Sequence, residues 1–208
     1  YADEHEGAGE LGKTECWYVL SADPGSKIIY GHTAETKEEL RKLIETGQWD
    51  QLLKEVEVKA GDFYYVPSGT IHALGSGVMV LETQQSSDTT YRLYDYDRVD
   101  DEGNPRDLHI EESIDVTTVP AQENPVNPTT KNVENGQITT LVSNQFFTVY
   151  EWKIDGPVSF TQESFYTLVS VIDGEGTLEI EDKYYPISKG DHFILPNPIQ
   201  NWTLKGNL

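Results

Sequence analysis

Short runs of alternating apolar and polar residues make up most of the chain, and turn sequences separate them. Asp23-Pro24-Gly25, Ala60-Gly61-Asp62 and Lys189-Gly190-Asp191 are such turns. Alternation with a period of two is typical of strands that bury one face, so we predict antiparallel β structure. The predicted strands are 16–21, 27–30, 56–59, 63–66, 78–83, 90–94, 138–142, 146–152, 166–172, 177–180 and 192–195. So many short strands indicate an all-β barrel or sandwich.

One segment follows a helical period instead. Leu40, Leu43 and Ile44 form its apolar stripe. Thr36 and Glu39 have the spacing of a capping box, and Gly47 follows as the stop. A capping box followed by an apolar stripe and a glycine predicts a helix. Residues 48–53 are expected to add a second short helical turn. We therefore predict a small helical insertion near residues 34–53.

The two halves of the chain repeat one motif. Residues 61–72 read Gly-Asp-x4-Pro-x4-His, and residues 190–201 read Gly-Asp-x4-Pro-x4-Asn. Upstream of these motifs, residues 14–20 align with 162–168. An internal repeat of this kind predicts two copies of one structural unit.

The domain boundaries follow from the repeat and from a proline-containing polar stretch between the copies. We predict a first unit over residues 1–119, a linker over 120–135 and a second unit over 136–208.

The strongly negative net charge of the chain argues against polyanionic partners. The 208 residues include 15 Lys and Arg against 36 Asp and Glu, which gives a net charge of −21 at pH 7. This charge repels phosphate backbones and anionic lipid headgroups, so nucleic acids and membranes are poor candidates as partners. A single cysteine, Cys16, rules out an internal disulfide framework, and we expect it to be a small buried apolar side chain.

Candidate metal chemistry lies in the first copy of the repeat. Glu15 begins a predicted strand, and His72 follows a Pro-Ser-Gly turn after another. Carboxylate and imidazole groups both suit a borderline metal such as zinc, and strand ends of a small barrel can converge. In the second copy Asn201 replaces the histidine although Glu163 remains aligned with Glu15. We expect that copy to have lost any metal and to serve packing.

Several blocks of the sequence resemble a known family. They are Lys-Thr-Glu-Cys-Trp-Tyr at 13–18, Tyr-Tyr-Val-Pro-Ser-Gly-Thr-Ile-His-Ala-Leu at 64–74, Leu-Glu-Thr-Gln-Gln at 81–85 and Tyr-Arg-Leu-Tyr-Asp-Tyr-Asp-Arg at 91–98. These blocks are similar to the short bacterial type I mannose-6-phosphate isomerases. The resemblance implies a tandem cupin fold, one zinc ion in the first cupin, and interconversion of mannose 6-phosphate and fructose 6-phosphate in cytoplasmic mannose metabolism.

The resemblance also implies that Glu15 and His72 are two of the zinc ligands. In the family the other two come from a Gln-x-His-Pro block, which this sequence lacks. We therefore expect a family member without its N-terminal third and with an incomplete first cupin. Two ligands fall short of the three that catalytic zinc usually keeps, so metal binding and turnover by this chain should be impaired. His5 is an alternative ligand, although it lies in an acidic run at 3–12 that reads as a loop.

Three basic residues have roles implied by the resemblance. It places Arg92 at the active site as a catalytic residue, and it places Lys13 and Arg98 near the metal and the substrate phosphate. Arg92 falls on the predicted strand 90–94, and a guanidinium suits a sugar phosphate or a developing enediolate. An ion pair with Asp95 or Asp97 is the alternative for Arg92, and surface salt bridges are the alternative for Lys13 and Arg98.

The group that shuttles the proton is not identified by the sequence. Glu82 is a candidate because it is an acid on an apolar strand, but a structural carboxylate is favoured there. His32 and His109 lack any motif, so exposed or packing roles are favoured, and His192 is interpreted as structural.

The function expected for the parent protein is zinc-dependent isomerisation of a small sugar phosphate. The alternative is a non-catalytic cupin module that binds a sugar or a partner. An iron or manganese cupin oxidase would need a His-x-His block before the glutamate, and none exists here. The missing strands would leave sheet edges open, so self-association through those edges is also expected.

Overall fold

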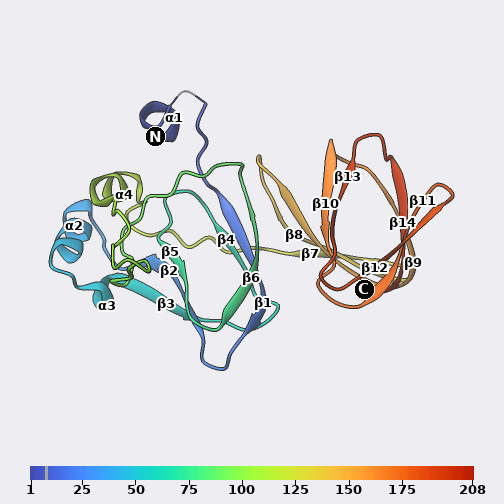
Figure 1. The fold of residues 1–208 in the computed structure, drawn as a ribbon, viewed down its shortest axis with the longest axis horizontal. Coiled ribbons are helices and arrows are strands. Elements are labelled where there is room, and N and C mark those ends of the chain that lie inside the picture. The colour runs from blue at the N-terminus through green and yellow to red at the C-terminus, as the bar shows by residue number, and fades with distance from the viewer. Residues whose placement is uncertain (8) are drawn as a thin grey trace. The chain divides into compact units, whose positions relative to one another are not determined.

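A computed structural model describes residues 1–7 and 9–208 of the chain. These residues form two compact units, Tyr1–Val126 and Asn127–Leu208 (Figure 1). The segment 120–135, expected to be a linker, contains strand β7 (Thr129–Val133). This strand forms because Thr129 to Val133 pair antiparallel with residues that follow the turn after it.

The first unit is built from two antiparallel sheets of three strands each. One sheet has the order β4-β1-β6, with β4 at Phe63–Val66, β1 at Glu15–Ala22 and β6 at Val78–Gln84. The other has the order β3-β2-β5, with β3 at Leu53–Glu57, β2 at Lys27–His32 and β5 at His72–Leu74. Buried side chains from both sheets, together with Val58 directly after β3, form one core, and those from the sheets are Trp17, Val19, Ile28 and Val66.

The predicted helical insertion is present beside these sheets. Helix α2 spans Lys37–Glu45, and helix α3 spans Trp49–Leu52. The Thr36 hydroxyl accepts a hydrogen bond from the Glu39 backbone N–H at 3.1 Å, as in a capping box. The Glu39 carboxylate accepts from the backbone N–H of Glu35 at 2.9 Å, so the reciprocal bond goes to the residue before the cap.

A second hydrophobic core lies under the helices. Helix α4 (Ile110–Val116) was not predicted, because its first turn carries two glutamates but no side-chain cap. The buried residues of this core are Ala34, Leu40, Leu43, Ile44, Leu52 and Ile114.

No helix in the described residues has the length and apolar composition needed to cross a lipid bilayer.

The second unit also has two antiparallel sheets. Strands β10 (Tyr166–Ser170) and β13 (His192–Pro196) pair with each other. The other sheet has the order β12-β11-β14-β9-β8-β7. Its further strands are β12 at Lys183–Ser188, β11 at Glu175–Ile180, β14 at Asn201–Asn207, β9 at Thr148–Thr161 and β8 at Gly136–Ser143. The core contains Leu178, Leu195, Trp202 and Leu204.

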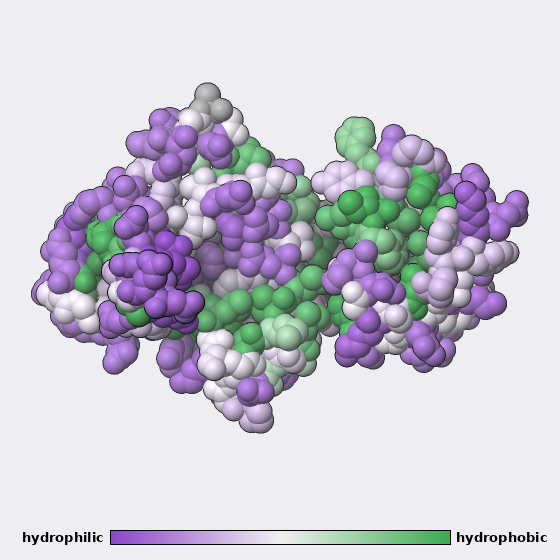
Figure 2. Space-filling view, in the orientation of Figure 1, coloured by the Kyte–Doolittle hydropathy of each residue, from purple (hydrophilic) through white to green (hydrophobic). Residues whose placement is uncertain are grey.

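Hydrophobic side chains are also exposed on the second unit. Figure 2 shows them over β10 and β13, where the exposed fractions are 58% for Tyr166, 64% for Leu168 and 61% for Ile194. These side chains share one face of the β10–β13 pair, because Tyr166 lies opposite Pro196 and Leu168 lies opposite Ile194.

The repeat predicted from the sequence is visible in the turns of the two units. The Lys59 N–H donates to the Asp62 carboxylate at 2.9 Å, and the Ser188 N–H donates to the Asp191 carboxylate at 2.7 Å. Both turns contain a glycine with positive φ, +88° at Gly61 and +96° at Gly190. Such values are unfavourable for other residues, which explains the shared Gly-Asp pair.

The strand register corrects the upstream part of the alignment. Glu15 lies opposite Val66, whereas Leu195, the counterpart of Val66 in the second motif, lies opposite Thr167. The counterpart of Glu15 is therefore Thr167 and not Glu163. The alignment was wrong by four residues because it followed letter similarity, which does not determine the hydrogen-bond register.

The predicted strand at 90–94 is also absent. The backbone of Arg92 is instead paired with His109, which donates its N–H to Arg92 O at 2.7 Å and accepts the Arg92 N–H on Nδ1 at 3.0 Å. These bonds satisfy the segment without a neighbouring strand. At the N-terminus, the run expected to be a loop begins within helix α1 (Ala2–His5), and Ala8 of that run lies outside the described residues.

The second core makes a direct prediction about stability. Leu40 is fully buried, so Leu40→Ala should lower the free energy of unfolding by about 2–5 kcal/mol through lost burial and a residual cavity. Chemical denaturation measures this loss. Glu38→Ala on the exposed side of the same helix is the control and should change stability by less than about 0.5 kcal/mol. Equal effects of the two substitutions would contradict the packing described.

Candidate functional site

The structure brings Glu15 and His72 together. Glu15 is 1% exposed, and its Oε1 lies 3.0 Å from Nε2 of His72. This contact lacks hydrogen-bond geometry, and Oε1 has no hydrogen-bond partner among the described residues. The other ring nitrogen of His72, Nδ1, lies 2.7 Å from the Thr70 carbonyl oxygen. Since a carbonyl only accepts, Nδ1 carries a proton, and in the neutral form of the ring the lone pair lies on Nε2 beside the carboxylate.

Backbone register places both side chains. Glu15 is the first residue of β1, the central strand of its sheet, and lies opposite Val66 on β4. His72 is the first residue of β5 and lies opposite Tyr30 on β2. The turn before His72 is closed by a hydrogen bond from Thr70 N–H to Pro67 O at 3.1 Å. Glu15 and His72 therefore come from different sheets, and the 67–72 segment connects these two sheets.

A charged network extends from the glutamate. The ammonium of Lys13 contacts Oε2 of Glu15 and lies 3.2 Å from Oε1 of Glu82. The other oxygen of Glu82 accepts from the Trp17 indole N–H at 3.0 Å. The Trp17 ring also meets the His72 ring edge-on at 5.3 Å between centroids. Glu82 is thus held by two donors, and sequence reasoning missed Trp17, because an aromatic residue on a strand reads as core.

These contacts shift the pKa values of the charged groups. Burial would raise the pKa of Glu15, but His72 and Lys13 outweigh it and hold that pKa below the usual value. Burial would lower the pKa of His72, but the neighbouring Glu15 carboxylate outweighs it and raises that pKa. Burial likewise opposes the rise in the pKa of Lys13 that Glu15 and Glu82 cause. His72 and Lys13 therefore stabilise the charged form of Glu15, and Glu15 stabilises the charged forms of both.

The donor atoms of this pair fit a zinc ion as two of its ligands. An unpartnered buried carboxylate oxygen and an imidazole nitrogen lie side by side, and the far ring nitrogen is fixed by a carbonyl, as is usual for metal-binding histidines. In the described part of the chain, however, no three His, Cys, Asp or Glu side chains form a metal-binding group. His5 lies in α1 with its ring stacked on Tyr1 at 3.9 Å, and it does not join Glu15 and His72.

Arg92 lies in a half-buried, non-strand segment. Its guanidinium donates to the carbonyl oxygen of Asp107 at 3.1 Å. The ion pair with Asp95, which was the alternative for Arg92, is formed by Arg106 instead. The Nε of Arg106 donates to Asp95 Oδ2 at 2.8 Å. This bond holds the pKa of Asp95 below its usual value. Arg106 was not singled out from the sequence, because nothing in the spacing connects it with Asp95.

Arg98 lies at the end of an aromatic ladder. Its guanidinium lies 5.4 Å from the ring centroid of Tyr96, which packs on Tyr94 at 4.6 Å. Tyr94 in turn stacks on Trp49 at 4.4 Å. Tyr96 has a φ of +53°, which is unusual for a tyrosine. The ladder therefore fixes the loop that carries Arg98.

The remaining residues singled out from the sequence are structural in their contacts. Cys16 is 1% exposed, as expected of a buried apolar side chain, and burial raises the pKa of its thiol to about 12. His109 precedes α4 and accepts a hydrogen bond from the Arg92 backbone. His192 is exposed, and its Nδ1 lies 2.8 Å from the Ser170 hydroxyl.

The fold and the site together define a class of protein. Two antiparallel units share one turn motif, and only the first has a Glu and a His at the paired positions. The second has Thr167 and Asn201 there. The chain is a tandem cupin with one candidate metal centre.

Comparison with known proteins specifies the kind of cupin. The sequence model of the family described as "Mannose-6-phosphate isomerase, cupin domain" matches residues 137–208. Over 208 residues, the chain is 57% identical to the mannose-6-phosphate isomerase of Streptococcus mutans serotype c and covers 65% of its length. A crystal structure of the mannose 6-phosphate isomerase from Bacillus subtilis matches 100% of this chain and 66% of its own, with a TM-score of 0.95 and 49% identity.

A more distant solved structure has the same fold. It is a mannose 6-phosphate isomerase bound with zinc and yttrium, which matches 94% of this chain and 64% of its own at 13% identity and a TM-score of 0.72.

The 57% identity over 208 residues makes the chain a relative of the mannose-6-phosphate isomerases along its full length, which confirms the resemblance seen in the sequence blocks. It spans about 65% of the length of the curated relatives it matches.

Proposed function

We propose that this chain provides the metal-binding cupin of a zinc-dependent isomerase that interconverts mannose 6-phosphate and fructose 6-phosphate. The observation that carries the proposal is the buried Glu15 carboxylate oxygen, 3.0 Å from His72 Nε2 and without a hydrogen-bond partner among the described residues. The isomerase relatives, 57% and 49% identical to the chain, support the choice of substrate. The same relationship supports a role in cytoplasmic mannose metabolism.

Glu15 and His72 would hold the zinc ion. A bound zinc ion polarises a carbonyl oxygen and stabilises the negative charge that develops during isomerisation. Two further ligands would come from the part of the relatives that this chain does not span. The Thr70 carbonyl keeps the proton of His72 on Nδ1, which leaves Nε2 free to act as a ligand.

The basic residues would bind the substrate. Arg92 can donate paired hydrogen bonds to a phosphate or to a developing enediolate through its planar guanidinium. Lys13 and Arg98 would add positive charge for an anionic substrate in a chain with a net charge of −21. Lys13 already contacts Glu15, and it therefore links the metal ligand with the substrate side. Glu82 is bonded to Lys13 and Trp17, which favours a structural role over that of the proton-shuttling base.

A non-catalytic cupin module that binds a sugar or a partner is the second candidate function. The observation that favours it is that no group of three metal-binding side chains occurs in the described residues. Self-association through open sheet edges also stays a prediction, since β4 and β6 each pair on one side only with β1.

Zinc titration of the chain tests the metal centre. We expect weak binding of at most one zinc ion per chain, because two of the ligands lie outside it, and His72→Ala should weaken this binding by at least about tenfold because it removes a further ligand. Isothermal titration calorimetry measures both the stoichiometry and the affinity. His192→Ala in the second unit is the matched control and should bind as the unchanged chain does. Equal binding by the chain and by His72→Ala would overturn the assignment of this centre.

The role of Arg92 requires an assay of the reaction. The test protein is a hybrid in which the Streptococcus mutans relative supplies the part of its length that this chain does not span. We expect it to convert mannose 6-phosphate to fructose 6-phosphate, and Arg92→Gln should lower kcat/KM by roughly 10²-fold or more with unchanged zinc content.

Arg41→Gln is the control for that assay, because Arg41 pairs with Glu111 on the surface at 2.7 Å. Full activity of Arg92→Gln would remove Arg92 from the catalytic machinery. A hybrid that binds zinc and substrate without turnover would favour the non-catalytic module.

A further inference from the structure

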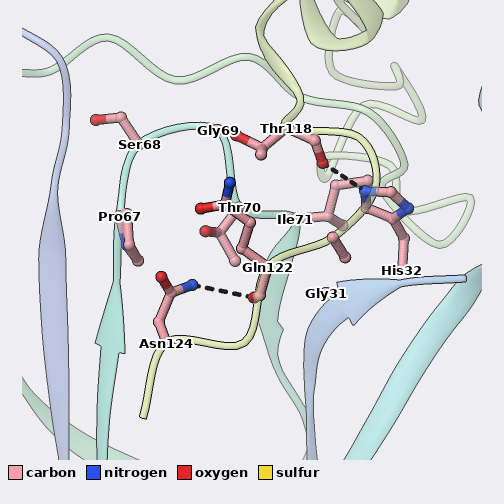
Figure 3. A pocket seen from close by; sticks show the side chains of 11 residues that line it. Gly31, His32, Pro67, Ser68, Gly69, Thr70, Ile71, Thr118, Gln122 and Asn124 are labelled. Atoms are coloured by element: carbon pink, nitrogen blue, oxygen red, sulfur yellow. Dashed lines mark hydrogen bonds between the residues drawn. The ribbon is translucent and has the colours of Figure 1, made fainter. Parts of the chain in front are cut away.

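A small cavity lies behind the turn that carries His72. Its volume is about 70 Å³, and its lining includes the 67–71 segment, the end of β2 and residues near Thr118 (Figure 3). His32 lies at this cavity with an exposed fraction of only 2%. Exposed or packing roles were favoured for His32 from the sequence, and the contacts of Glu15 and His72 do not involve it.

A chain of hydrogen bonds connects His32 with the turn. Its Nε2 lies 2.9 Å from the carbonyl oxygen of Thr118, as the dashed line in Figure 3 shows. The backbone N–H of Thr118 donates to the Gly69 carbonyl oxygen at 2.9 Å. Because the Thr118 carbonyl can only accept, the Nε2 of His32 carries a proton and donates it.

The 67–70 turn, held in this position, orients the ring of His72. Gly69 is followed by Thr70, whose carbonyl oxygen lies 2.7 Å from Nδ1 of His72. Gly69 has a φ of +87°, and a Cβ there would lie 2.8 Å from both the Thr118 hydroxyl and the Val116 carbonyl oxygen. The contact with the 116–118 segment is therefore close, and we expect a shift of that segment to change the direction of the Thr70 carbonyl.

Strand β2 holds the same loop from its other side. The Gly31 N–H donates to the Ile71 carbonyl oxygen at 2.7 Å, and Tyr30 lies opposite His72. Consecutive residues of one strand thus hold the His72 loop, Tyr30 and Gly31 directly and His32 through Thr118. With only the direct bonds, the 67–70 turn would lack its support from the 116–118 segment.

We propose that His32 is a positioning residue for the metal centre, acting through Thr118 and the 67–70 turn to fix the ring of His72. The proposal rests on the proposed function, in which His72 binds zinc. Its structural part, the coupling between His32 and His72, is open to measurement without metal.

Two substitutions of His32 separate hydrogen bonding from packing. His32→Gln keeps an N–H donor that can reach the Thr118 carbonyl, whereas His32→Leu fills similar space and removes the donor. In the metal-free chain, NMR follows the Nδ1 proton of His72, assigned by its loss in His72→Gln. We expect its exchange with solvent to be at least about tenfold faster in His32→Leu, and to be close to that of the unchanged chain in His32→Gln.

Zinc affinity provides the second measurement. His32→Leu should weaken zinc binding by about 10- to 100-fold, the range found when the partner that orients a metal ligand is lost. His32→Gln should stay within about threefold of the unchanged chain, because it retains the hydrogen bond that orients the ligand. Val58→Ala is the control for general destabilisation, since Val58 is buried in the core of the same unit but outside this hydrogen-bond chain.

The outcomes distinguish this proposal from the proposed function. Equal losses in His32→Leu, His32→Gln and Val58→Ala would mean that His32 only packs, which would overturn the proposal. Zinc binding by the unchanged chain that does not depend on His72 would overturn the proposed metal centre. Unchanged exchange of the His72 proton in His32→Leu would overturn the coupling, whatever the zinc affinity is.

Discussion

A buried carboxylate must be compensated, and the compensation of Glu15 organises the first unit. His72 and Lys13 both approach this carboxylate, which is 1% exposed. Removing one partner of a buried ion pair costs about 3–5 kcal/mol, so the arrangement is a strong local constraint. It ties the start of β1 to the start of β5, which belong to different sheets. The same constraint leaves one carboxylate oxygen and one ring nitrogen side by side, as two metal ligands would be.

Much of the fold could be predicted from local signals. Turn glycines such as Gly61 and Gly190 with positive φ mark the repeat, and the stripe on α2 marks the helical insertion. The approach of Glu15 to His72 was also predictable, because the alternating pattern places Glu15 at the start of a strand and the Gly-Asp-x4-Pro-x4-His motif places His72 after a turn. These features depend on turn chemistry and on hydrophobic period, which short stretches of sequence determine.

The features that could not be predicted depend on long-range pairing. Letter similarity aligned Glu163 with Glu15, whereas hydrogen-bond register makes Thr167 its counterpart. Arg92 was expected on a strand, but its backbone is satisfied by His109, far along the sequence. The support of the 67–70 turn by His32 likewise runs through a residue distant in sequence. No local pattern encodes these partners, because each is determined by the packing of separate elements.

The proposed zinc chemistry requires that Glu15 and His72 form one centre. A double-mutant cycle measures this directly, with zinc affinity determined for the chain, for Glu15→Gln, for His72→Gln and for the double variant. If both side chains hold one ion, the double variant should bind zinc about as weakly as either single variant. If the two losses in binding free energy simply add, the side chains act independently, which contradicts a single shared centre.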